Sequence, residues 1–192
     1  AAAAVALSAL DATTGNEIWV QELGDTATGA PTIAGGLVYV TSGDQRGWAI
    51  EAEDGRIRWQ VEGLEDVNNV AGAPAPALSD DSVIFAFGNG SVRSVLRQGG
   101  LQLWNADVVG TRTGSALAGV TDITGAPVIS GGTVYVGNHS GRVVAFRAGS
   151  GERIWRPLNN PETVVTSSFQ EATPKGFGLL QRDREFEHYL DG

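Results

Sequence analysis

The chain has 192 residues, of which 42% are hydrophobic and 18% are charged, as in an ordinary globular domain with a core. Its net charge is −9 and Lys175 is its only lysine, so it lacks the basic patch that a nucleic-acid-binding protein would carry. The absence of cysteine excludes disulfides and cysteine-ligated metal sites.

An alanine-rich run occupies residues 1–10. The run is too short to span a bilayer, and it has no basic segment of the kind that opens a signal peptide. We therefore predict no transmembrane segment in this chain. Because the run leads directly into a repeat, we expect that residues upstream of it have been removed.

A Gly-x-x-x-Trp motif occurs four times along the chain, and its tryptophans are 40, 45 and 51 residues apart. The glycines are Gly15, Gly55, Gly100 and Gly151, and the tryptophans are Trp19, Trp59, Trp104 and Trp155. A period of this length is typical of propeller blades. A large aromatic side chain that recurs once per unit is expected to pack one unit against the next.

Each unit also begins with a proline, which is followed by a short apolar stretch and a two-residue turn. The prolines are Pro31, Pro76 and Pro127, and the turns are Gly35–Gly36, Asp80–Asp81 and Gly131–Gly132. Glycine and aspartate tolerate the positive φ angles of tight hairpins. The β-branched and aromatic residues after each turn, at 38–40, 83–85 and 134–136, predict strands.

Four short strands per unit predict an all-β fold, a partial β-propeller of four-stranded blades. The sequence holds about three to four blades, three complete and one partial. An arc that does not close leaves strand edges exposed, so we expect further blades outside this sequence. The loop at 109–123 is longer than its counterparts, and long loops on a rigid scaffold are where function concentrates.

Residues 10–19, Leu-Asp-Ala-Thr-Thr-Gly-Asn-Glu-Ile-Trp, resemble the PQQ-like (WD40-like) propeller repeat. Within that group, residues 1–156 are similar to the BamB family of outer-membrane assembly lipoproteins. The resemblance is carried by Ala-Pro-Ala at 75–77, by 88–96 and 98–104, and by Val-Thr-Asp-Ile at 120–123. It implies an eight-bladed, non-catalytic scaffold in the periplasm, held at the outer membrane by a lipid anchor on the missing N-terminus.

The same resemblance implies a partner, the periplasmic domains of the β-barrel insertase BamA, which the family contacts through two loops. In the first loop the family's apolar and arginine contacts are replaced around Asn68, Val70 and Ala71. The second loop carries Arg112 and retains Asp122, whereas Thr124 stands where the family has a second acid. An alternative interpretation of Asp122 is that its carboxylate only caps a turn.

The last forty residues leave the repeat. Residues 151–192, and above all 175–191, resemble an internal stretch of the periplasmic glucan biosynthesis protein family (OpgG/OpgD). We therefore divide the chain into a partial propeller at 1–150 and a segment at 151–192 that is not an independent domain. The change of resemblance near 151–156 predicts a hybrid of two sequences, and it leaves β-1,2-glucan biosynthesis or carbohydrate processing, with glucan as a ligand, as the alternative function.

Enzymatic readings are weaker. A PQQ-dependent dehydrogenase fragment shares the repeat. That class, however, places its quinone and calcium at the axis of a closed ring, usually beside a disulfide, whereas this sequence has no cysteine and holds only part of a ring. His139 and His188 lie in unrelated segments, which makes a zinc site improbable. The acidic residues of the tail alternate with Arg182 and Arg184, as on a solvated, ion-paired face, and this pattern disfavours a pair of catalytic carboxylates. We expect no enzyme activity, no cofactor and no metal.

Overall fold

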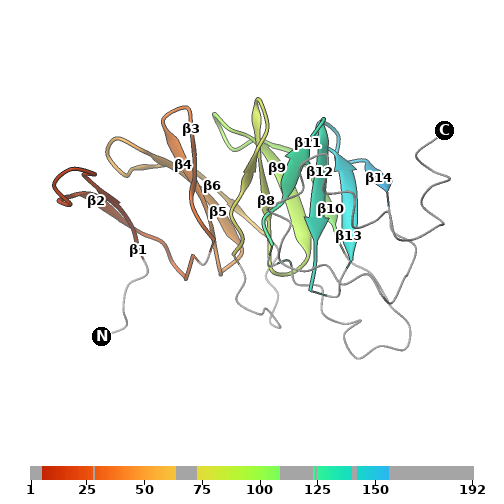
Figure 1. Ribbon diagram of the computed structural model, residues 1–192, viewed down its shortest axis with the longest axis horizontal. Coiled ribbons are helices and arrows are strands. Elements are labelled where there is room, and N and C mark those ends of the chain that lie inside the picture. Colours follow the sequence, from red (N-terminus) through yellow and green to blue (C-terminus); the bar gives the residue numbers. More distant parts are fainter. Residues whose placement is uncertain are drawn as a thin grey trace.

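A computed structural model describes residues 6–27, 29–63, 73–108, 123, 125–139 and 142–155. In these ranges every regular element is a β-strand, and the strands form one two-stranded and three four-stranded antiparallel sheets that follow one another in a row (Figure 1). The described part contains no helix of the length and apolarity needed to cross a membrane.

The sheets follow the chain in order. The first contains β1 (Ala6–Leu10) and β2 (Glu17–Glu22), and the second contains β3 (Thr32–Ala34), β4 (Leu37–Ser42), β5 (Arg46–Glu51) and β6 (Ile57–Glu62). The third contains β7 (Ala77–Leu78), β8 (Ser82–Ala86), β9 (Ser91–Leu96) and β10 (Gln102–Asp107). The fourth contains β11 (Val128–Ser130), β12 (Thr133–Gly137), β13 (Val143–Arg147) and β14 (Arg153–Trp155).

Each four-stranded sheet is an up-and-down meander whose strands pair in sequence order. The prolines precede the first strand, and the Gly-x-x-x-Trp motifs lead into the last. Strands β1 and β2 match the last two strands of such a sheet, since Ala9 pairs with Trp19 as Ala49 pairs with Trp59. The predicted all-β partial propeller is therefore confirmed.

The turns between the first two strands of each sheet form in two different ways. Gly35 and Gly36 have φ angles of 58° and 77°, and the second glycine pair repeats these values within a few degrees. Asp80 and Asp81 turn the chain without a positive φ, and Ser79 N–H donates to Ser82 O over 2.9 Å. The prediction that Asp80 and Asp81 adopt positive φ angles was therefore wrong, because two ordinary residues can close this turn with negative φ angles.

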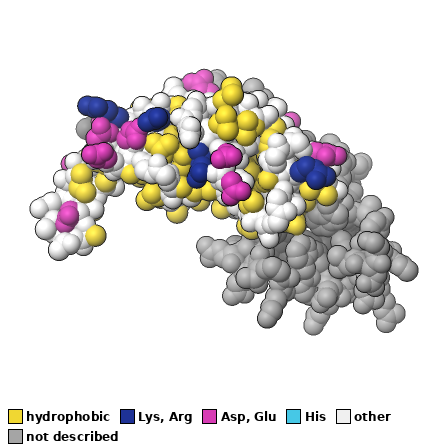
Figure 2. Space-filling view, turned by 90° about the horizontal axis from the view of Figure 1, so that it is seen from above, with side chains coloured by type: hydrophobic (Ala, Val, Ile, Leu, Met, Phe, Trp, Pro, Cys, Tyr) yellow, Lys and Arg dark blue, Asp and Glu magenta, His cyan; other side chains and the backbone are white. Residues whose placement is uncertain are grey.

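The core lies between the sheets rather than inside one of them. Strand β4 and strand β8 are buried along their whole length, because a neighbouring sheet covers each of their faces. Tyr39 faces the third sheet, whereas Val38 and Val40 face the first. Viewed from the edge that carries the glycine turns, the sheets form a curved row on which acidic, basic and apolar side chains are interspersed (Figure 2).

Candidate partner-binding face and the contacts that position it

The tryptophans join each sheet to the next by the same hydrogen bond. The indole N–H groups of Trp19, Trp59 and Trp104 donate to the backbone carbonyls of Ala52, Arg97 and Ala148, over 3.0, 2.9 and 2.7 Å. Each acceptor is the first residue after the third strand of the following sheet. The side chain thus fills the space between sheets and satisfies a turn carbonyl at the same time.

The glycine of the motif forms the seat for the preceding tryptophan. A Cβ atom at Gly55, Gly100 or Gly151 would lie 2.7, 2.9 or 2.6 Å from the Cδ2 atom of Trp19, Trp59 or Trp104, respectively. The three glycines also have φ angles of 75°, 68° and 69°, a conformation that L side chains rarely adopt. Trp155 ends β14, and its side chain lies outside the described residues.

One edge of the row carries the attachment points of both loops that the sequence predicts to contact a partner. Gly63, after β6, donates from its N–H to Gln45 O over 2.5 Å, and Val108, after β10, donates to Gly90 O over 2.8 Å. Gln45 and Gly90 lie in the β4–β5 and β8–β9 turns. The described ends of the two loops therefore share the edge opposite the glycine turns.

The predicted partner residues are not placed by the structure. Asn68, Val70, Ala71, Arg112, Asp122 and Thr124 all lie outside the described residues. Ile123 is described, and it is fully buried in the cluster that contains Val108, Val134 and Val136. Ile123 itself is thus anchored in the core by its side chain.

Two residues with a role at this edge were not predicted from the sequence. Ile123 could have been found from the sequence, because a β-branched apolar residue between polar neighbours indicates an anchor in the core. The sequence gives no indication of the role of Gln45. This residue is 3% exposed and has a φ of 64°, which is uncommon for a residue other than glycine. Its carbonyl receives the Gly63 hydrogen bond, so the end of β6 depends on this turn.

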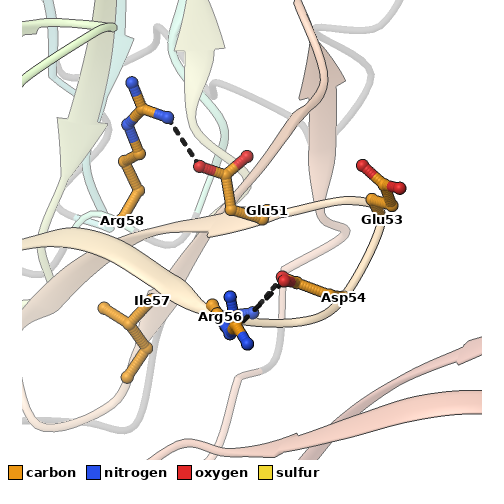
Figure 3. A pocket seen from close by; sticks show the side chains of 6 residues that line it. All are labelled: Glu51, Glu53, Asp54, Arg56, Ile57 and Arg58. Atoms are coloured by element: carbon orange, nitrogen blue, oxygen red, sulfur yellow. Dashed lines mark hydrogen bonds and ion pairs between the residues drawn. The ribbon is translucent and has the colours of Figure 1, made fainter.

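The opposite edge holds a shallow depression beside the β5–β6 turn (Figure 3). Four of its five charged side chains form ion pairs: Arg58 Nη1 lies 2.7 Å from Glu51 Oε1, and Arg56 Nε lies 3.4 Å from Asp54 Oδ2. Exposed pairs of this kind contribute about 0–1 kcal/mol and leave little net charge for a ligand. No group of three or more His, Asp or Glu side chains within the described ranges is arranged to hold a metal ion.

Two pKa shifts have structural causes. Burial raises the pKa of the Tyr39 hydroxyl, with a smaller opposing effect from Arg97. Hydrogen bonds from Thr14 and Thr13 lower the pKa of Asp11. Both shifts move the group away from neutral pH, so neither residue is prepared for proton transfer there.

Comparison with solved structures identifies the fold. BamB from Moraxella catarrhalis superposes with a TM-score of 0.69 at 24% identity, over 79% of this chain and 46% of that one. Quinohemoprotein alcohol dehydrogenase from Comamonas testosteroni superposes with a TM-score of 0.61 at 22% identity, over 76% of this chain and 23% of that one. The fold is therefore shared by a protein of outer-membrane assembly and by enzymes.

Short matches connect the chain to glucan biosynthesis proteins. Glucans biosynthesis protein D 2 of Ralstonia nicotianae is 59% identical over 54 residues, which are 28% of this chain and 10% of that protein. Glucans biosynthesis protein G of Serratia proteamaculans is 53% identical over 53 residues, with the same two shares. The chain thus spans about a tenth of these relatives, and the predicted resemblance to them is confirmed for a segment of this size.

The widest match is to a family rather than to a single protein. It covers residues 2–170, which include all four sheets and both predicted partner loops. The repeat of strands, turns and tryptophan seats lies entirely within it. The chain therefore belongs to the family of the outer membrane protein assembly factor BamB.

Proposed function

We propose that this chain is a non-catalytic periplasmic scaffold that binds the periplasmic domains of the outer-membrane insertase BamA. Family membership over residues 2–170 carries the proposal. The edge that bears the ends of both predicted loops supports it, because Gly63 and Val108 are each bonded to a neighbouring turn. Rigid attachment lowers the entropic cost of ordering a loop on a partner.

A scaffold role also agrees with how the polar side chains between the sheets are used. The indole N–H groups are engaged in joining sheets, and Asn138 Nδ2 donates to Val108 O over 3.4 Å. Both kinds of contact stiffen the row. We assign the binding energy to loop contacts around Asp122 and Arg112. Ile123, the residue after Asp122 in the sequence, is anchored in the core.

Replacing Asp122 with alanine is expected to weaken binding to the BamA periplasmic domains about tenfold, which corresponds to about 1.4 kcal/mol. The matched control is Asp81→Ala, which removes an exposed turn carboxylate at the opposite edge of the sheets. Biolayer interferometry with immobilised BamA domains gives both dissociation constants, and circular dichroism checks that both variants are folded. Equal affinities for the two variants would show that Asp122 is not a contact.

A second function rests on the matches to glucan biosynthesis proteins, at 59% identity over 54 residues. We propose that residues 151–192 form a separate segment of that origin, with β14 as the place where it joins the last sheet of the propeller part at 1–150. This segment would bind β-1,2-glucan. Its short length relative to those proteins makes binding a better expectation than catalysis.

Titration of the full chain with linear β-1,2-glucan tests this second function. Saturable heat release in calorimetry is expected if the segment binds glucan, whereas linear β-1,3-glucan of the same length should give none. Mass spectrometry of the recovered glucan detects any shortening. Identical traces for the two polymers would remove the glucan function and leave the scaffold proposal unaffected.

A further inference from the structure

The amide side chain of Asn138 holds the residue from which the second predicted partner loop starts. Asn138 Nδ2 donates to Val108 O over 3.4 Å, and the Val108 N–H donates to Gly90 O over 2.8 Å. Both backbone polar groups of Val108 are therefore bonded, one to the residue after β12 and one to the β8–β9 turn. Because Val108 directly precedes the loop at 109–123, these bonds set where the loop leaves the sheets.

The turn that carries Asn138 fixes the orientation of this amide. The Arg142 N–H donates to Asn138 Oδ1 over 3.0 Å, and the Asn138 N–H donates to Arg142 O over 2.9 Å. Since Oδ1 already faces a donor, the other end of the amide is directed at the Val108 carbonyl. Asn138 is only 7% exposed, so water competes little for this bond.

Apolar contacts hold both ends of the same loop. Val108 and Ile123 are both 0% exposed, and they belong to one cluster with Val134 and Val136 of β12. Asn138 directly follows the end of β12. One strand therefore supplies the apolar contacts for both loop ends, and the residue after that strand supplies the hydrogen bond to the first of them.

A buried amide also holds the start of the first partner loop. Gln45 O accepts the Gly63 N–H over 2.5 Å, and Gln45 Oε1 accepts the Asn89 N–H over 3.5 Å. Gln45 thus connects the end of β6 to the β8–β9 turn, in which Gly90 holds Val108. The starts of both loops are joined by one chain of hydrogen bonds that crosses from the second sheet to the third.

We propose that Asn138 is a positioning residue for partner binding, which acts through Val108 rather than by contacting the partner. The inference rests on the proposed binding to the BamA periplasmic domains. A loop whose start is fixed loses less conformational entropy when a partner orders it. Removal of the Asn138 donor should therefore weaken binding without altering a single residue of the loop.

Asn138→Asp tests this inference, because the two side chains have the same shape. The carboxylate still accepts the Arg142 N–H, but it cannot donate to Val108 O. Its dissociation constant for the BamA periplasmic domains is expected to rise about tenfold. The Val108 amide hydrogen should exchange about tenfold faster by NMR. The control is Asn105→Asp, which adds the same charge at an exposed position of β10 and should change neither value.

A double-mutant cycle separates positioning from a general loss of stability. Arg112→Ala removes a predicted contact within the loop. If Asn138 acts through the loop, Asn138→Asp should raise the dissociation constant only about twofold in the Arg112→Ala background. A merely destabilising substitution would act by the same factor in both backgrounds. If circular dichroism shows that Asn138→Asp is unfolded, Asn138→Ala replaces it, because alanine removes the donor without burying a charge.

The outcomes separate this inference from the proposed function. A Val108 exchange rate that stays at the wild-type value, or equal factors in the two backgrounds of the cycle, would overturn the inference and leave the proposed function standing. A wild-type chain that does not bind the BamA domains would refute the proposed function. Faster exchange at Val108 in the variant would then still support the role of Asn138 in fixing the start of the loop.

Discussion

Replacing Trp104 with alanine is expected to lower the free energy of unfolding by about 3–5 kcal/mol, the range for a truncated core aromatic. Trp104 is 7% exposed, and its ring centroid lies 6.1 Å from that of Phe146. The substitution removes this packing and leaves the Ala148 carbonyl without its 2.7 Å donor between two sheets. Urea denaturation followed by far-UV circular dichroism measures the loss.

The control for Trp104 is its neighbour on β10. Leu103 is 45% exposed, so Leu103→Ala should change the free energy of unfolding by only about 0.5 kcal/mol. The two variants remove apolar side chains from opposite faces of one strand. Losses of similar size would mean that the tryptophan seat contributes no more to stability than an exposed leucine does.

Replacing Gly29 with alanine is expected to destabilise the protein by about 3 kcal/mol through overpacking. A Cβ at Gly29 would lie 2.5 Å from the carbonyl carbon of Pro74, and closer still to the Ala73 oxygen and the Ala75 nitrogen. These are backbone atoms, so no side chain can rotate to make room. Ala73 directly follows the first predicted partner loop, so BamA binding should weaken as well.

Gly125 provides the matched control, because it also begins a Gly-Ala-Pro sequence that leads into the first strand of a sheet. No described atom lies within 4 Å of a Cβ at Gly125, and its φ is not positive. Gly125→Ala should therefore leave the urea midpoint unchanged or raise it slightly, since alanine restricts the unfolded chain. A Gly29→Ala midpoint equal to that of Gly125→Ala would contradict the close approach at Ala73.

The repeat made the fold predictable because each structural feature, a tight turn or a contact between sheets, is marked by its own residue type. Gly35 and Gly36 predicted a tight hairpin, and both have the positive φ angles that such a turn requires. The tryptophans predicted contacts between units. The ring centroid of Trp59 lies 5.9 Å from that of Tyr39 in its own sheet and 6.2 Å from that of Phe85 in the next sheet.

Other features depended on tertiary context that a local pattern does not contain. Asp80–Asp81 has the composition of a positive-φ turn but closes without one. Gln45 adopts a positive φ that its side chain does not favour, in a turn whose carbonyl bonds to Gly63. The partner residues came from loop composition and family resemblance alone, and the structure adds to them only the buried anchor Ile123.

Because each seat needs only a glycine on one sheet and a tryptophan on the sheet before it, the row behaves as a one-dimensional array with nearest-neighbour coupling. Loss of one unit removes one junction and leaves the others chemically unchanged. Gene rearrangements that cut between units, or that append foreign sequence after β14, can therefore preserve the cooperative core. An array of this kind tolerates changes in repeat number that a domain with a single central core would not.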